Sequence, residues 1–121
     1  MRLLIDTNVL LDYLAKREPF LKSAEAIVDA CATGKVDGSI AAHSFSNIFY
    51  ILRNVFRVDE RKKLLLDLCV LFTVEGINQQ TIETSLRNNY FDDFEDCLQM
   101  ECAISIFVTK NGFLTENRKI L

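Results

Sequence analysis

Four acidic side chains crowd into five positions within the stretch YFDDFEDCLQMECA at residues 90–103: they are Asp92, Asp93, Glu95 and Asp96. The stretch otherwise has the pattern of an amphipathic helix. Residues three positions apart lie on one face of a helix, so Asp93 and Asp96 could hold a cation together with a third acid. The alternative needs no chemistry, because acids in the first turn of a helix are stabilised by its dipole, and Asp92 with Glu95 fits a capping box. Both interpretations can hold at once.

A third acid is found near the start of the chain. Asp6 ends the apolar run RLLID, which predicts a buried strand because it is too short for a helix. A carboxylate at the end of a buried strand is costly to desolvate unless something pairs with it. Carboxylate oxygens favour Mg²⁺ or Mn²⁺ over softer metals, and such an ion can activate water to hydrolyse a phosphodiester bond. We therefore expect Asp6, Asp93 and Asp96 to form a catalytic metal site.

The elements expected between these acids alternate strands with helices. Strands are predicted at RLLID, at VDGSIAA (36–42), weakly at TVEGI (73–77) and at SIFVTK (105–110). Helices are predicted after residues 7, 19, 43, 59, 78 and 93, with Asn78 as a cap. This alternation is typical of a parallel sheet that is covered on both faces, in which ligands bind beyond the carboxyl ends of the strands. We expect one three-layer α/β/α domain over residues 1–121, with a central parallel sheet of four to five strands.

Composition narrows the class of protein. The 121 residues are 50% hydrophobic and carry a formal net charge of −3, which argues against a globally basic nucleic-acid binder. The four cysteines and the single histidine, His43, lack the paired spacings of a zinc site, so we expect buried, reduced thiols. The apolar residues before Asp6 are too few for a signal peptide, and no later apolar run approaches membrane-spanning length. We expect a cytoplasmic protein with no membrane partner.

Three stretches together resemble the PIN domains, small metal-dependent ribonucleases that include the VapC-type toxins of bacterial toxin–antitoxin pairs. LLIDTNVLLDYL is similar to the N-terminal strand and first helix of that family, and SIAAHSFSNIFYILR to its second strand and the following helix. DFEDCLQMECAISIFVTKN is similar to the late acidic helix and the strand after it. DTN and DFED are each weak motifs alone, but the resemblance spans nearly the whole chain and both lie in the expected order.

The resemblance implies roles for particular residues. Asp6 matches the first catalytic acid and Asp96 the acid of the late helix, with Asp93 a nearby acid of the same motif; a Mg²⁺ or Mn²⁺ cofactor and an RNA substrate follow. It also implies a homodimer and a cognate antitoxin that covers the site. Residues expected to surround the metal ligands without holding the ion are Thr7, Asn8, Asn47 and Asn111.

Two departures from the family pattern leave the function open. Many PIN domains have a glutamate where this chain has Asn47, and residues 109–121 lack the usual late aspartate, offering only Asn111 and Glu116. The last strand is expected to be missing or short. One interpretation is a metal-dependent endoribonuclease, the toxin of a type II pair; the alternative is a catalytically degenerate module that binds RNA or protein. A receiver-like signalling domain fits the order of the acids poorly, and Lys110 is its only candidate lysine.

Two further groups of side chains have alternative interpretations. Arg53 and Arg57, together with Arg61, Lys62 and Lys63, lie around one predicted helix junction, where they could contact an RNA backbone or simply form a solvated helix face. Phe45, Phe49 and Phe56 are expected to fill the core, although part of that face could bind a second copy or an antitoxin.

Overall fold

A parallel sheet of three strands forms the centre of the structure, a computed structural model that describes residues 2–89 and 92–111 and the side chains as far as Ile106. The strands are β1 (Arg2–Leu4), β2 (Asp37–Ala41) and β3 (Thr73–Glu75), in the order β1-β2-β3. Leu4 lies opposite Ser39, and Ala41 lies opposite Glu75. The three strands predicted first along the sequence are thus present, and β3 includes only the first three residues of the predicted stretch TVEGI.

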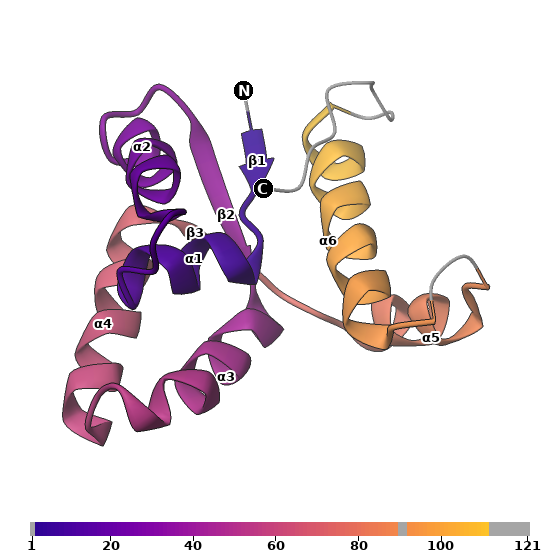
Figure 1. Cartoon of the computed structure of the whole chain (residues 1–121). Helices are drawn as coiled ribbons and strands as arrows, with labels where there is room; N and C mark the ends of the chain where they lie inside the picture. Colours follow the sequence, from indigo (N-terminus) through magenta and orange to yellow (C-terminus); the bar gives the residue numbers. More distant parts are fainter. Residues whose placement is uncertain (1, 90–91, 112–121) are drawn as a thin grey trace.

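Helices cover both faces of this sheet, as Figure 1 shows. Helices α1, α2, α3 and α4 lie on one side, and α6 lies on the other, which gives the expected α/β/α layers. None of the described helices is long and apolar enough to cross a membrane. Their bounds are α1 (Thr7–Leu14), α2 (Leu21–Ala32), α3 (Ala42–Ile51), the 3-10 turn η1 (Leu52–Asn54), α4 (Val58–Leu71), α5 (Gln79–Arg87) and α6 (Phe94–Asn111).

Alternation along the strands divides the core in two. Leu3, Ile5 and Ile40 point into a large cluster formed with buried side chains of α1, α2, α3 and α4. Leu4 and Ala41 point the other way, into a small cluster whose remaining members come from α6, namely Cys102, Ala103 and Ile106. Because side chains of a strand alternate between the two faces of its sheet, a strand buried on both faces must be apolar throughout, as β1 is after Arg2.

Gly38 lets β2 approach the layer of helices closely. A Cβ atom at this position would lie 2.7 Å from the Sγ of Cys31 and 2.9 Å from Cδ1 of Phe72. Both of those side chains are buried, so neither can move away without disturbing the packing of the core. The glycine is therefore required here for space.

The sequence prediction is wrong for the stretch SIFVTK. Helix α6 runs on through it to Asn111, so these residues form no strand, and no fourth strand is present within residues 2–89 and 92–111. The reason is packing: Cys102 and Ile106 are four positions apart and so lie on the same helix face, where both are buried against the sheet. That burial outweighs the strand preference of the β-branched residues. Lys110, the candidate lysine of a receiver-like domain, consequently lies in a helix and not at the end of a strand.

Local signals at helix ends are largely confirmed. The side chain of Asn78 accepts a hydrogen bond from the backbone N–H of Thr81 at 2.9 Å, which caps α5. In α6 the cap is one residue later than the sequence suggested, because it is Asp93 that accepts from the backbone N–H of Asp96, at 3.1 Å. None of the four cysteines forms a disulfide, but Cys69 is exposed, so the prediction of four buried thiols fails there.

Candidate functional site

A pocket of about 300 Å³ lies where α1, α3 and the beginning of α6 meet. It brings together residues from both ends of the described chain. Its acidic lining residues are Asp6, Asp93, Glu95 and Asp96, its amides are Asn8, Asn47 and Gln99, and Thr7 and Tyr50 also line it. The three acids predicted to form a metal site therefore share one cavity, and three of the four residues expected around them line it as well.

Asp6 is fixed by contacts on both of its carboxylate oxygens. It is the N-cap residue of α1, and its Oδ2 accepts a hydrogen bond from the backbone N–H of Asn8 at 3.1 Å. Its Oδ1 lies 3.5 Å from Nε2 of Gln99, which is 93 positions away on α6. The strand β1 and the start of α1 place the carboxylate at the pocket, and α6 closes over it.

Asp93, which immediately precedes α6, and Asp96, in the first turn of α6, line the same pocket. Both are exposed, and Oδ1 of Asp93 accepts the backbone N–H of Asp96. Only one oxygen of Asp93 appears in that cap, so its second oxygen can face a ligand. The capping and chemical explanations of the crowded acids are therefore compatible in this geometry.

The residues expected around the metal ligands behave differently from one another. Thr7 Oγ1 donates a buried hydrogen bond of 2.9 Å to Ser44 Oγ, which ties the start of α1 to α3. Asn47 is half-buried on α3 and brings an amide oxygen to the pocket without a negative charge. Asn111 is the last residue of α6 and its side chain lies outside the described residues, as does the whole of Glu116.

The donor atoms of the pocket suit a hard divalent cation. They are carboxylate and amide oxygens, which Mg²⁺ and Mn²⁺ prefer. The nearby thiol of Cys97 is a poor ligand, because burial, followed by the charges of Asp96 and Asp93, raises its pKa and keeps the sulfur protonated. Within the described part of the chain no three Asp, Glu, His or Cys side chains are arranged to enclose an ion. Mg²⁺ commonly binds one or two protein carboxylates and keeps several waters, so this set fits a partly hydrated ion.

Two polar side chains near the pocket carry buried atoms that have no hydrogen-bond partner among the described residues. Gln99 is only 5% exposed, and its Oε1 has no donor. An unpaired buried polar group costs roughly 1–3 kcal/mol, so such an atom usually marks a missing partner. Both ring nitrogens of His43 are also unpaired; burial lowers the pKa of His43, and the carboxylate of Glu95 opposes that shift only in part.

Sequence reasoning did not identify Gln99, because a glutamine within an amphipathic helix resembles any residue of the solvated face. Its one available signal is its spacing. Gln99 follows Asp96 by three positions and therefore lies on the same face of α6.

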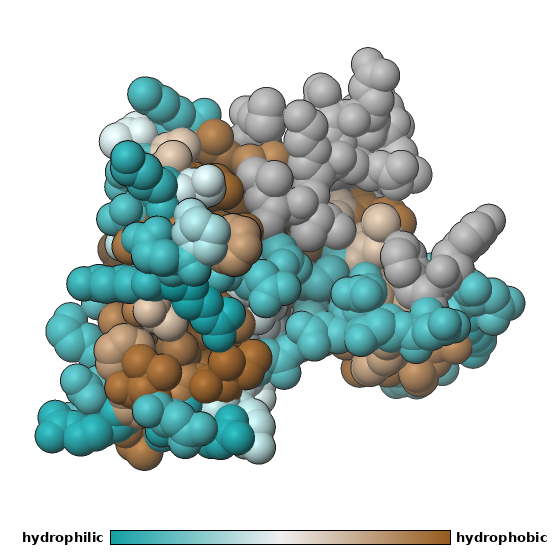
Figure 2. Space-filling view, in the orientation of Figure 1, coloured by the Kyte–Doolittle hydropathy of each residue, from teal (hydrophilic) through white to brown (hydrophobic). Residues whose placement is uncertain are grey.

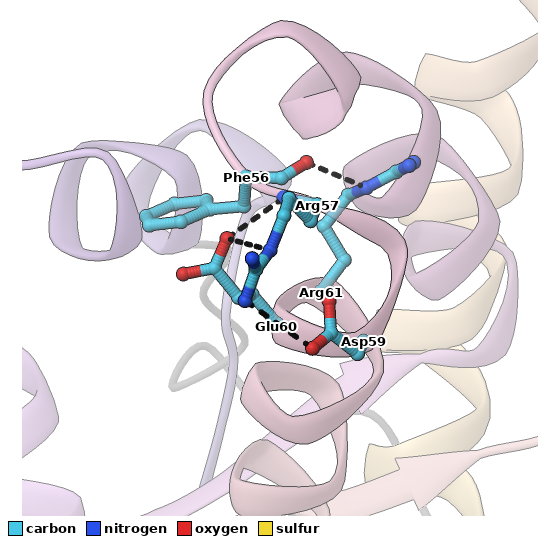
Figure 3. A network of polar contacts seen from close by, with 5 residues as sticks. All are labelled: Phe56, Arg57, Asp59, Glu60 and Arg61. Carbon is cyan, nitrogen blue, oxygen red and sulfur yellow. Dashed lines mark hydrogen bonds and ion pairs between the residues drawn. The ribbon is translucent and has the colours of Figure 1, made fainter.

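The three arginines among the basic residues predicted to contact RNA lie in different environments. The guanidinium of Arg53 lies over the ring of Tyr50, 3.8 Å from its centroid, and Tyr50 lines the pocket. Arg57 is exposed at the start of α4, where it pairs with Asp59 at 3.4 Å and with Glu60 at 3.5 Å (Figure 3). Arg61 was grouped with these two, but its side chain is buried, so a role in contacting RNA is wrong for it.

Some of the aromatic and aliphatic residues around α3 and α4 are packed in the core, and others are exposed. Phe45 and Phe56 pack against the large core, as expected. Exposed apolar side chains are found instead at Val58, Leu66 and Val70 on α4 and at Val55 just before it. Figure 2 shows hydrophobic surface over α3 and α4 and hydrophilic surface over the middle of the molecule.

Comparisons with known proteins agree with this architecture. A family model described as "PIN domain" matches residues 2–118. Among solved structures, the crystal structure of VapC20 from Mycobacterium tuberculosis, described as a Sarcin-Ricin loop cleaving toxin, superposes with a TM-score of 0.64. That match covers 92% of this chain and 84% of the other at 12% sequence identity, so it shows a shared fold. No curated protein matches the chain.

Proposed function

Because the chain belongs to the PIN domain family, we propose that it is a Mg²⁺- or Mn²⁺-dependent endoribonuclease that hydrolyses phosphodiester bonds in RNA. The observation that carries the proposal is the pocket in which Asp6 meets Asp93 and Asp96. Acids brought together from opposite ends of a chain repel one another, and a cation offsets that repulsion. The similarity in fold to VapC20 further supports the proposal that this protein is the toxin of a type II toxin–antitoxin pair.

In this proposal Asp6 and Asp96 hold the ion, and Asp93 helps to hold it or its waters. The bound ion would supply an activated water and would offset the charge that develops on the phosphate. Thr7 and Asn8 fix the start of α1, so that the Asp6 carboxylate keeps its position.

RNA would bind along the rim of the pocket. Tyr50 is 59% exposed there, and an exposed aromatic ring can stack on an unpaired base. Arg53 lies over that ring and can contact an adjacent phosphate, while Arg57 lies further along the chain at the start of α4. The net negative charge of the protein makes such local contacts, together with the metal ion, the means of attracting RNA.

Two protein partners belong to the same proposal: a second copy of the chain and a cognate antitoxin. Family resemblance suggests both. The exposed apolar side chains on α4, Val58, Leu66 and Val70, supply surface that a protein partner can cover.

A second candidate function is a degenerate PIN domain that binds RNA or protein without cleavage. Two observations favour it: Asn47 supplies no charge to the pocket, and no three ligand side chains in the described part of the chain enclose an ion. The two candidates differ in whether a divalent cation binds.

The test of the proposed function is Mn²⁺ titration calorimetry followed by an RNA-cleavage assay, on the wild type and on Asp96→Asn and Asp93→Asn. We expect the wild type to bind Mn²⁺ and to cut RNA, with cleavage lost on addition of EDTA. Asp96→Asn should lose at least about tenfold in Mn²⁺ affinity, and Asp93→Asn should lose less. Asparagine also caps helices well, so α6 should persist in both variants. A folded wild type that neither binds Mn²⁺ nor cleaves RNA would favour the binding module.

Asn47→Glu should strengthen the site. A carboxylate on the α3 wall of the pocket adds a negative charge beside the proposed ion, and we expect Mn²⁺ affinity to rise about tenfold. Asn47→Gln has the length of glutamate without its charge and is the matched control, which should leave the affinity near that of the wild type. If Asn47→Glu and Asn47→Gln bind Mn²⁺ equally, the ion does not lie near α3.

A further inference from the structure

Gln99 is the most deeply buried of the polar residues that line the pocket. It is 5% exposed, it lies on α6 one turn after Asp96, and its Nε2 is 3.5 Å from Oδ1 of Asp6. Its Oε1 is buried and has no hydrogen-bond partner among the described residues. One half of the amide therefore contacts a candidate metal ligand, and the other half has no described partner.

The orientation of this amide follows from the chemistry of its neighbour. An ionised carboxylate only accepts hydrogen bonds, so the NH₂ group of Gln99 must face Asp6, and the carbonyl oxygen must face elsewhere. The other acids that line the pocket, Asp93, Glu95 and Asp96, are acceptors too when ionised and cannot supply the missing proton. Because no other described residue donates to Oε1 either, a water or another group bound in the pocket is left as its donor.

A hydrated divalent cation satisfies both halves of the site. Its charge pairs with the carboxylates, and the protons of its bound waters are strong donors for a neutral oxygen. We propose that Gln99 faces the cation of this site: its nitrogen positions the Asp6 carboxylate, and its oxygen accepts a hydrogen bond from a metal-bound water. This inference rests on the proposed function.

The first test is Mn²⁺ titration calorimetry on Gln99→Met, performed below the melting temperature of every variant. Methionine keeps the length and burial of the side chain but has neither the donor nor the carbonyl oxygen. We expect Mn²⁺ affinity to fall about tenfold, which is typical when a group that orients a metal ligand is removed. The matched control is Ser85→Ala. It removes a buried polar group, which donates to the Thr81 carbonyl, from the adjacent helix α5 and away from the pocket, and it should leave the affinity unchanged.

The second test, thermal unfolding of Gln99→Glu with and without Mn²⁺, stays decisive if Gln99→Met fails to fold. In the metal-free protein the new carboxylate lies beside Asp6 and should lower the melting temperature through like-charge repulsion. If residue 99 faces the cation, Mn²⁺ removes that repulsion, so the melting temperature should rise more on addition of Mn²⁺ than it does for the wild type. A residue that only supports the fold would show no such extra rise.

The outcomes separate this inference from the proposed function. Suppose that Asp6→Asn weakens Mn²⁺ binding but Gln99→Met binds Mn²⁺ as tightly as the wild type. Gln99 then has no role toward the cation, and the inference is overturned while the proposed function stands. A Gln99→Glu variant whose melting temperature gains no more from Mn²⁺ than the wild type overturns it equally. If the folded wild type binds no Mn²⁺, the proposed function fails, and the inference fails with it.

Discussion

Asp6→Asn should abolish RNA cleavage and reduce Mn²⁺ affinity by about a hundredfold or more, because it removes the charge of the acid that β1 and α1 place in the pocket. The substitution should leave the fold intact. Asparagine is as good an N-cap residue as aspartate, so it can still accept the backbone N–H of Asn8 and begin α1. Calorimetry with Mn²⁺, a cleavage assay and a thermal melt on the same preparation measure the three properties separately.

A matched control for Asp6→Asn is Asp67→Asn, which removes an equal charge from the exposed face of α4. Asp67 is exposed and pairs there with Lys63 at 3.4 Å, an interaction between exposed side chains that contributes little. It should keep full Mn²⁺ affinity and full cleavage. Cleavage that survives in Asp6→Asn but not in EDTA would place the catalytic ion elsewhere in the protein.

Arg61→Met should lower the free energy of unfolding by about 2–4 kcal/mol. This is the largest loss of stability that we expect among the substitutions proposed for this protein. Arg61 is only 9% exposed. Its guanidinium donates to the backbone carbonyl of Phe56 at 3.1 Å (Figure 3). It also donates to the backbone carbonyl of Phe49 at 2.8 Å and lies over the Phe49 ring. Methionine fills the volume but leaves both carbonyl groups without this donor. Urea unfolding followed by circular dichroism measures the loss.

Arg57→Met is the natural comparison for Arg61→Met, because it removes the same group four positions earlier on the chain. The side chain of Arg57 is 78% exposed and makes only surface ion pairs, so this change should cost less than about 1 kcal/mol. Equal losses for the two variants would mean that the carbonyl contacts of Arg61 add nothing to stability.

The sequence predicts those parts of the molecule whose pattern is local. The short apolar run before Asp6 predicts the strand β1, and Asn78 marks the start of α5 through its own side chain. The sequence also predicts that Asp6 and Asp96 line one pocket, although the fourth strand that this prediction placed after the helix of Asp96 is absent from the described residues.

Features that depend on contacts between distant residues were not predictable in this way. Arg61 has the same residue type and neighbours as an exposed basic residue, and only the position of α3 reveals that its side chain turns inward. The stretch SIFVTK has β-branched residues that suit a strand, yet Cys102 and Ile106 find their burial on a helix face against Leu4. The role proposed for Gln99 likewise depends on its contact with Asp6, which is far from it in the sequence.

The small cluster that attaches α6 to the sheet has a consequence for how stability is distributed. It holds Leu4 and Ala41 against three side chains of α6, whereas Asp6 begins α1, which packs into the larger cluster. We therefore expect helix α6 to open locally at a free energy below that of global unfolding. A ligand that contacts both Asp6 and α6 binds only while α6 is packed on the sheet. Its binding free energy therefore adds to the free energy that is needed to open α6. A ligand bound in the pocket should therefore make local unfolding of α6 less frequent, and local unfolding of α6 should weaken binding of the ligand.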